Sequence, residues 1–165
     1  MHDTVSRATE ADVDAVASLW HDGWHDAHAE LVPRSLSELR TPETFRERTR
    51  RHLKRVRVIR RDDARVVGLR ITKGDELFQL YVGARARGTG AALALMHDAE
   101  GRLRARGVRR AWLACAIGNE RAARFYRKCG WRLAGAVLDE LETLDGAFTL
   151  EVWRFEKALS GPPET

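Results

Sequence analysis

The chain has 165 residues, 44% of them hydrophobic, which fits a single domain over residues 1–165 with one hydrophobic core. Its formal charge of +5 is the balance of 29 basic and 24 acidic residues spread along the chain. That dispersal argues against a nucleic-acid partner and leaves most arginines on a solvated surface.

The sequence predicts neither a signal peptide nor a membrane-spanning segment. The sequence opens without a basic segment followed by an apolar run, and no apolar run approaches the roughly 20 residues that span a bilayer. Cys115 and Cys129 are the only cysteines, too few for a disulfide scaffold and without metal-ligand spacing. We therefore expect reduced thiols, a cytoplasmic location and no membrane partner.

The first predicted helix begins after Thr9, with Asp12 placed three residues later as in a capping box. Hydrophobic residues then recur at helical spacing and define a core-facing side: Val13, Val16, Ala17, Trp20 and Trp24. The segment 21–51 has weak periodicity and contains Gly23 and two prolines as breakers, which predicts short helices and loops.

From residue 56 onward the hydrophobic residues alternate with a period of two, which is typical of strands. The turns RDDA and TKGDE separate three strand-length runs and predict an antiparallel meander. After Gly90 the helical spacing returns as far as Gly107, and RRAWLACAI follows as a strand. A strand, a glycine turn, a helix and a strand predict a βαβ unit.

The last third predicts one helix and two strands. Asn119 is a good N-cap for a helix that ends at Gly130. The segments WRLAGAVLDE and AFTLEVWRFE read as strands joined by a turn at LDG, and residues 160–165 are expected to form a flexible tail.

The glycine turn RARGTGAA, residues 85–92, carries the first chemical signal. Gly88 and Gly90 allow the backbone to approach a ligand closely, and the helix that follows offers unpaired N–H groups and a positive dipole end. These features suit phosphate, and Arg85 and Arg87 add positive charge. The glycines could instead serve close packing alone. The turn matches neither a P-loop nor the dinucleotide fingerprint.

A second motif, GNERAARFYRKCGW, follows the βαβ unit. Its pattern consists of Asn119, Ala122, Phe125, Tyr126, Gly130 and Trp131. Together with Arg85, Gly88 and Gly90, this sequence resembles the GNAT superfamily of acetyl-coenzyme A (acetyl-CoA) dependent N-acetyltransferases. The resemblance implies an α/β (α+β) GNAT fold, with a central mixed, mostly antiparallel twisted sheet of about six to seven strands flanked by helices.

The resemblance also implies where acetyl-CoA, as co-substrate, would bind. The pyrophosphate would lie on the backbone amides between Arg85 and Ala91, and the pantetheine arm would pair with the strand before the turn. The cofactor residues implied are Leu80, Tyr81, Val82, Arg85, Arg87, Gly88, Thr89, Gly90, Ala91 and Asn119. Asn119 could also serve only as a helix cap. The sequence departs from the family at Ala84, where a proline is common.

Two residues are candidates for catalysis. Glu76 stands where some family members carry a catalytic glutamate, and a carboxylate can take the proton of an attacking amine. The alternative is that Glu76 belongs to a solvated hairpin turn, since other members use a water chain. Tyr126 matches the family tyrosine proposed to protonate the leaving thiolate. Its alternative is a core aromatic on the apolar side of its helix.

The segment after the first helix covers the acceptor pocket in this family. Trp24, His25, His28 and Glu30 are therefore candidate walls for the amine, although Trp24 could be core and the others a solvated rim. His21 and His25 are one helical turn apart, but Asp22 stands where a zinc-protease helix requires glutamate, so no metal is expected.

The sequence thus predicts an enzyme that moves the acetyl group of acetyl-CoA to a primary amine by direct attack in a ternary complex. The acceptor could be a small molecule or a peptide, and family habit makes a homodimer through the late strands an option. The alternative is a non-catalytic module of the same fold that binds or senses acyl-CoA. A covalent route through Cys115 or Cys129 is disfavoured because neither lies near a histidine in the sequence.

Overall fold

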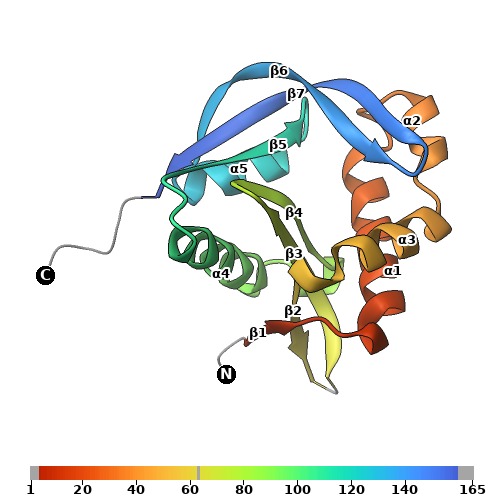
Figure 1. Cartoon of the computed structure of the whole chain (residues 1–165), viewed down its shortest axis with the longest axis vertical. Coiled ribbons are helices and arrows are strands. Elements are labelled where there is room, and N and C mark those ends of the chain that lie inside the picture. Colours follow the sequence, from red (N-terminus) through yellow and green to blue (C-terminus); the bar gives the residue numbers. More distant parts are fainter. Residues whose placement is uncertain (1–3, 63, 160–165) are drawn as a thin grey trace, which may run out of the picture.

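Seven strands form one mixed sheet at the centre of the structure, a computed structural model that describes residues 4–62 and 64–159 (Figure 1). The predicted tail, residues 160–165, lies outside the described residues. The strands are β1 (Val5–Arg7), β2 (Val56–Arg61), β3 (Arg65–Lys73), β4 (Glu76–Val82), β5 (Arg110–Ala116), β6 (Arg132–Thr143) and β7 (Gly146–Ala158). Their order across the sheet is β1-β2-β3-β4-β5-β7-β6. Among the described strands, β4 and β5 pair in parallel and all other neighbours are antiparallel. The predicted fold class is confirmed.

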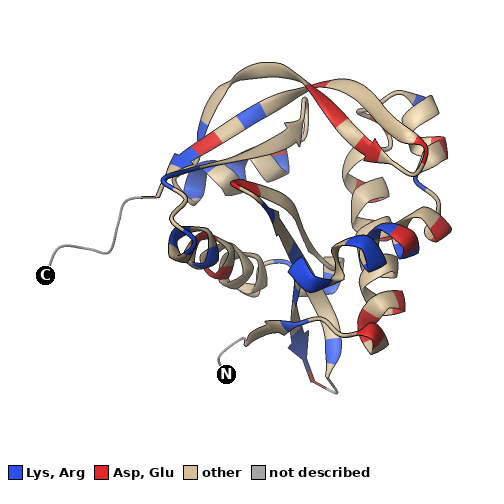
Figure 2. Ribbon diagram, viewed as in Figure 1, with Lys and Arg blue, Asp and Glu red and all other residues tan. Residues whose placement is uncertain are grey.

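Five α-helices flank this sheet: α1 (Val13–His28), α2 (Arg34–Leu39), α3 (Pro42–His52), α4 (Ala91–Ala105) and α5 (Glu120–Lys128). Short 3-10 segments are η1 (Glu10–Asp12), η2 (Leu53–Arg55) and η3 (Ala84–Ala86). The first three helices cover one face, and α4 and α5 cover the other (Figure 1). Charges of both signs are spread over these elements (Figure 2). Over residues 4–62 and 64–159, none of the helices has the length and apolarity needed to cross a bilayer.

Helix α1 confirms the predicted core face and corrects the expectation that Gly23 breaks the chain. The five hydrophobic residues of that face are all buried. Gly23 lies within α1, and a Cβ there would lie 2.7 Å from Cδ1 of Tyr81. Glycine is therefore needed because the helix backbone packs directly on the Tyr81 ring.

The six-residue α2 and the turns beside it agree with the expectation of short helices and loops, whereas α3 is longer and runs for 11 residues. Pro42 occupies its first turn, where a missing N–H costs nothing, and the Thr41 hydroxyl accepts from the Thr44 N–H at 3.2 Å. Phe45 packs in one core cluster with Val16, Trp20 and Trp24 of α1, and the Arg48 guanidinium lies over the Trp20 ring. The hydrophobic period is weak because part of this buried face is polar.

The later elements agree with the prediction. The meander of β2, β3 and β4 is antiparallel, and α4 joins β4 to β5 as a βαβ unit. The Asn119 side chain accepts from the Ala122 N–H at 3.3 Å and caps α5. A short strand, β1, also pairs with β2 and was not predicted.

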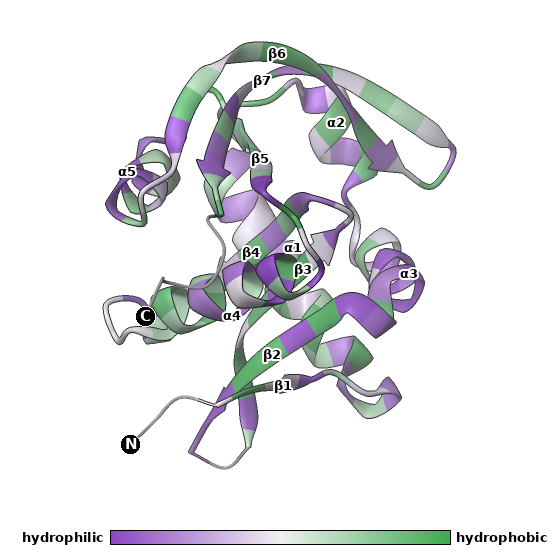
Figure 3. Ribbon diagram, turned by 60° about the vertical axis from the view of Figure 1, so that its left-hand side comes forward, coloured by the Kyte–Doolittle hydropathy of each residue, from purple (hydrophilic) through white to green (hydrophobic). Residues whose placement is uncertain are grey.

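The β6–β7 hairpin reaches across the sheet to the helices on the other side. Leu141, Phe148 and Leu150, near its tip, pack against the core cluster formed by α1, α3 and the sheet. Strand β6 is one edge of the sheet and carries a run of hydrophobic residues (Figure 3). One of them, Leu138, is 74% exposed. The hairpin tip thus brings residues of β6 close to α3.

Gly68 provides a test of the packing between α4 and the sheet. A Cβ at Gly68 would lie 2.9 Å from Ile59 Cγ2 and 2.9 Å from Leu95 Cδ1. We expect Gly68→Ala to lower the free energy of unfolding by about 1–3 kcal/mol, because the packed core must shift. Gly101→Ala, in α4 with no atom within 4 Å of the new Cβ, should instead raise it by about 0.5–1 kcal/mol. Denaturant unfolding measures both, and equal effects would contradict this description of the core.

Candidate functional site

Strands β4 and β5 lie side by side only where they begin. Their register contains a single pair, Glu76 with Trp112, and beyond it the strands diverge. Two cavities adjoin this opening. The turn-side cavity, about 420 Å³, contains Gly88 and Gly90 in its wall, and the hairpin-side cavity, about 670 Å³, contains Glu76 and Glu142. Residues that line both cavities are His28, Phe78, Gln79, Tyr81, Ala114 and Ala116. The two cavities therefore meet at the opening between β4 and β5.

The turn-side cavity ends at the N-terminus of α4. Gly88 and Gly90 have φ angles of 74° and 89°, in the left-handed region that favours glycine. A Cβ at either position would have no heavy atom within 4 Å, so the space above the turn is open. Among residues 4–62 and 64–159, no side chain caps this helix, and its first N–H groups have no intrahelical partner. The turn is therefore suited to hold an anion.

Two arginines stand at the rim of the turn-side cavity and share one carboxylate. Nη2 of Arg87 lies 2.8 Å from Oδ2 of Asp26, and Nη2 of Arg121 lies 3.4 Å from the same oxygen. The hydrogen bond from Arg87, and then that from Arg121, lowers the pKa of Asp26. All three side chains are more than a third exposed, so the ion pairs are weak and a stronger anion can compete for both arginines.

Tyr126 and Cys115 also line the turn-side cavity. The Tyr126 ring packs 5.7 Å from the ring of Phe155. Burial raises the pKa of Tyr126, so its phenol is protonated at neutral pH and can donate a proton. Burial also raises the pKa of the Cys115 thiol to about 12, which keeps it from acting as a thiolate.

Most of the predicted cofactor residues share this cavity. Those that line it are Leu80, Tyr81, Val82, Arg87, Gly88, Gly90 and Asn119. The other three lie outside its lining. Arg85 is exposed in η3, Thr89 donates its hydroxyl hydrogen to the Ala86 carbonyl, and Ala91 is buried at the start of α4. Their roles stay predictions.

The hairpin-side cavity has an acidic end. Burial, and then repulsion by Asp139, raises the pKa of Glu76 to about 7. Burial likewise raises the pKa of Asp139. Lys73 lines the same cavity and opposes these shifts. Glu76 is therefore a carboxylate that can exchange a proton near neutral pH.

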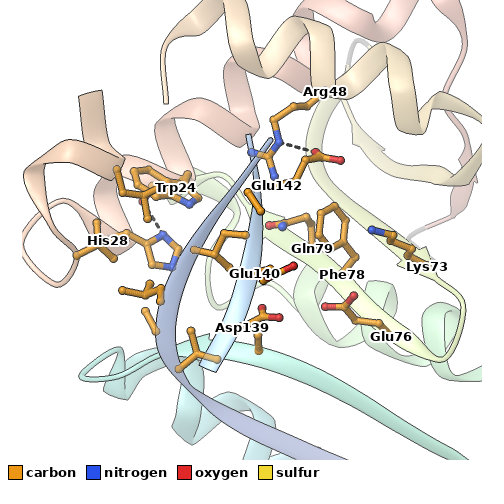
Figure 4. Close-up of a pocket in the computed structure, with 18 of the residues that line it drawn as sticks. Trp24, His28, Arg48, Lys73, Glu76, Phe78, Gln79, Asp139, Glu140 and Glu142 are labelled. Atoms are coloured by element: carbon orange, nitrogen blue, oxygen red, sulfur yellow. Dashed lines mark hydrogen bonds and ion pairs between the residues drawn. The ribbon is translucent and has the colours of Figure 1, made fainter. Parts of the chain in front are cut away.

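The other end of this cavity is formed by α3 and the hairpin tip (Figure 4). Nε of Arg48 lies 2.8 Å from Oε1 of Glu142, and Nε2 of His52 lies 3.0 Å from Oε2. Burial opposes the ionised form of Glu142, but the hydrogen bonds from His52 and Arg48 prevail and lower its pKa to about 2. Nη1 of Arg40 donates to the backbone carbonyl of the same glutamate.

His28 lies where the two cavities meet. Its Nδ1 is 2.8 Å from the Trp24 carbonyl oxygen, which can only accept, so Nδ1 carries the hydrogen (Figure 4). Nε2 is then left as an acceptor. Burial lowers the pKa of His28 to about 4, so the ring is neutral at physiological pH.

The predicted acceptor residues divide into two pairs. Trp24 and His28 line the hairpin-side cavity, and Trp24 also belongs to the core. His25 and Glu30 do not line it: Nε2 of His25 lies 2.6 Å from the Arg40 carbonyl oxygen, and Glu30 is exposed after α1. Within the described part of the chain, no group of three or more His, Cys, Asp or Glu residues could hold a metal ion.

Several residues of the hairpin-side cavity were not predicted from the sequence. They are Arg40, Arg48, Gln79, Asp139 and Glu142. The two arginines belong to an arginine-rich stretch that has the composition of a solvated surface. The one available signal is spacing, because Arg48 follows Phe45 by three residues and so lies on the same side of α3.

Comparison with known proteins agrees with this architecture. Residues 16–131 match the model of the acetyltransferase (GNAT) family. An uncharacterized N-acetyltransferase of Mycobacterium bovis is 41% identical over 80 residues, which are 46% of this chain and 51% of that protein. An uncharacterized N-acetyltransferase of Mycobacterium tuberculosis matches to the same extent. The match thus spans about half the length of these curated relatives.

Solved structures share the fold at low sequence identity. A GCN5-related N-acetyltransferase from Rhodopseudomonas palustris has a TM-score of 0.74 and 16% identity, with 96% of each chain covered. A phosphinothricin acetyltransferase from Sinorhizobium meliloti, in complex with acetyl-CoA, has a TM-score of 0.74 and 18% identity, covering 100% of this chain and 93% of that one. The family match covers most of the chain, and the protein therefore belongs to the GNAT acetyltransferase family.

The Glu142 cluster gives a prediction about pH. A carboxylate whose pKa is lowered in the folded state stabilises the protein above the unfolded pKa of 4.5, and the contribution is lost as the pH falls toward about 2. We expect Glu142→Gln to lower the free energy of unfolding at pH 7 by about 1–3 kcal/mol. The difference from the native protein should shrink below pH 4.5.

Unfolding curves measured from pH 7 to pH 3 test this expectation. Glu140→Gln is the matched control, because Glu140 is an exposed neighbour on β6 and its loss should change stability by no more than about 0.5 kcal/mol. A pH-independent effect of Glu142→Gln would contradict the proposed ion-pair contribution.

Proposed function

We propose that this protein is an acetyl-CoA dependent N-acetyltransferase that moves the acetyl group to a primary amine by direct attack within a ternary complex. The observation that carries the proposal is the meeting of two cavities at the opening between β4 and β5. The turn-side cavity has the features of a phosphate site, and the hairpin-side cavity carries titratable carboxylates. Two substrates bound on opposite sides of the opening would have their reacting groups close together, as a bimolecular transfer requires.

The turn-side cavity is the proposed site for acetyl-CoA. Backbone N–H groups at Gly88, Gly90 and the start of α4 would hold the pyrophosphate, and Arg87 and Arg121 would exchange Asp26 for phosphate oxygens. The fold is shared with the Sinorhizobium meliloti enzyme, which was solved in complex with acetyl-CoA. It is also shared with a PaiA N-acetyltransferase from Thermoplasma acidophilum in complex with coenzyme A. That structure has a TM-score of 0.64 and 15% identity, with 96% of this chain and 99% of that one covered. These complexes support the assignment.

The bound coenzyme would supply a thioester as acetyl donor. Beyond Glu76, the edge of β4 that faces β5 has no partner strand among the described residues, so its backbone groups at Leu80 and Val82 are available to an extended arm. Tyr126, protonated and in the same cavity, is the proposed donor of a proton to the departing sulfur.

Glu76 is the proposed base. An alkyl ammonium has a pKa of roughly 10, so the amine must lose a proton before it attacks. The pKa of Glu76, about 7, lies near physiological pH, where a carboxylate is most effective as a proton acceptor. Glu76 lines only the hairpin-side cavity, while the cavities meet at His28, so the proton would travel through water. Nε2 of His28 would accept a hydrogen bond from the amine and orient it.

A direct attack is preferred to an acyl-enzyme route. Cys115 is the thiol that lines the turn-side cavity, and burial raises its pKa to about 12. A thiol of that pKa is almost entirely protonated at pH 7 and is a poor nucleophile. The free thiols also fit a cytoplasmic location. A homodimer could form along β6, the exposed edge of the sheet.

Acetyl-CoA binding is tested by a matched pair of glycine substitutions. Gly88→Glu places a negative charge where the pyrophosphate would bind, and we expect the Kd for acetyl-CoA to rise at least 100-fold. Gly107→Glu is the control, because Gly107 has a similar φ of 84° and open space, but lies at the other end of α4. Calorimetric titration should find its Kd within about threefold of the native value. Equal losses in both variants would argue against the turn as the binding site.

The base is tested by the pH dependence of turnover. A base must be deprotonated to act, so kcat should fall as the pH drops below about 7, the pKa of Glu76. Glu76→Gln should lower kcat by roughly 10–100-fold and remove this inflection, with acetyl-CoA binding unchanged. Steady-state kinetics from pH 5.5 to 9 measure both effects. An inflection that persists in Glu76→Gln would assign the base elsewhere.

A further inference from the structure

Two buried arginines line the α3 end of the hairpin-side cavity. Arg40 follows α2 and is 3% exposed, and Arg48 lies in α3 and is 2% exposed. Each stacks on an aromatic ring: Arg40 lies 5.6 Å from the ring centroid of Trp24, and Arg48 lies 4.3 Å from that of Trp20. Burial of a guanidinium is costly unless it is paired with an anion, so the partners of these two groups have to be counted.

The arginines outnumber the anions that face them. Glu142 is the carboxylate at this end, and it already binds Arg48 and His52. The Arg40 side chain donates to the Glu142 carbonyl oxygen, which is its one hydrogen-bond acceptor among the described residues. Within the described residues, Nε of Arg40 and Nη1 of Arg48 are buried and have no hydrogen-bond partner. Aromatic rings stabilise a cation but leave these in-plane N–H groups unpaired.

The acidic end of the cavity lies away from the two arginines. Figure 4 shows Arg48 and Glu142 at one end of the site and Glu76 and Asp139 towards the other. Asp139 and Glu142 are three residues apart on β6, which corresponds to about 10 Å at the rise of a strand. The cavity therefore has a cationic end, where the two arginines share one carboxylate, and an acidic end, where Lys73 faces Glu76 and Asp139.

We propose that the acceptor amine also carries an anionic group, a carboxylate or a phosphonate, that binds Arg40 and Arg48 while the amine faces His28 and Glu76. This inference rests on the function proposed above and names the substrate class of that site. Both arginines line the cavity, so such a group would offset their excess positive charge there, and a planar carboxylate matches the forked donors of arginine. A polyamine would instead place a second cation beside two buried arginines.

Acceptor pairs that differ only in the anionic group test the proposal. The pairs are glycine with methylamine, β-alanine with ethylamine, and 4-aminobutyrate with propylamine, with 2-aminoethylphosphonate as the second anion. With saturating acetyl-CoA, we expect kcat/KM to be at least tenfold higher for the anionic member of one or more pairs. Comparison of β-alanine with 2-aminoethylphosphonate identifies the preferred anion. Equal or higher values for the uncharged-tail amines in every pair would overturn the proposal.

Substitutions then test whether Arg40 and Arg48 cause the preference for an anionic acceptor. Arg40→Gln should lower the ratio of kcat/KM within the preferred pair at least tenfold, mainly through KM. Arg48→Lys keeps a charge for Glu142 but lacks the forked donors, so it should lower the ratio less. Arg50→Gln, an exposed position on the same helix, should leave the ratio within twofold of the native value. Acetyl-CoA affinity and thermal stability confirm that each variant is folded. An unchanged ratio in folded Arg40→Gln would overturn the proposal.

Measurements of acceptor binding distinguish a failure of the anion-site proposal from a failure of the proposed acetyltransferase function. The three acids and the three amines are titrated calorimetrically into the protein saturated with coenzyme A. If no amine is acetylated, the proposed function fails by itself. Binding of an acid, but not of its matched amine, that is weakened by Arg40→Gln would still support the anion site. Binding of neither, or of both equally, would overturn it.

Discussion

The divergence of β4 from β5 is the constraint on which the rest of this structure depends. Parallel strands ordinarily continue their ladder, yet here a single pair, Glu76 with Trp112, joins them. At the strand starts the Trp112 N–H donates to the Asp75 carbonyl at 3.2 Å, and farther along, the edge of β4 that faces β5 has no partner strand among the described residues. The opening exists because different elements hold the two strands: β4 is paired to β3, and β5 is paired to β7.

The two sides of the opening present different chemical groups, backbone N–H groups on one side and side chains on the other. On one side, a glycine turn and the start of α4 present backbone N–H groups, which suit an anion with little dependence on side chains. On the other side, the cavity is lined by side chains from distant parts of the chain: α1, α2, α3, the β3–β4 hairpin, β5 and the β6–β7 hairpin. This division is expected in a family whose members share one co-substrate but differ in acceptor. Backbone groups are the same in every sequence and suit the shared co-substrate, whereas side chains differ and suit a variable acceptor.

Burial adjusts the protonation of the groups around the opening. It raises the pKa of Glu76 toward neutrality, keeps the Tyr126 phenol protonated and keeps the His28 ring neutral. In contrast, Glu142 is also half-buried, yet remains ionised because Arg48 and His52 donate to it. The same low-polarity surroundings therefore hold a carboxyl group that titrates near neutral pH, a protonated phenol and a fixed ion pair.

The sequence alone determined the order and type of most elements and the glycine turn. These features are local: the alternation of β2 to β4, the apolar face of α1 and the turn at Gly88 and Gly90 are each written in neighbouring residues. The tertiary structure alone decided the place of Gly23 inside α1, because the Tyr81 ring that requires it comes from β4. It also decided the wall of the hairpin-side cavity. Arg48 and Glu142 are 94 residues apart, so only the packing of the hairpin against α3 distinguishes them from solvated surface charges.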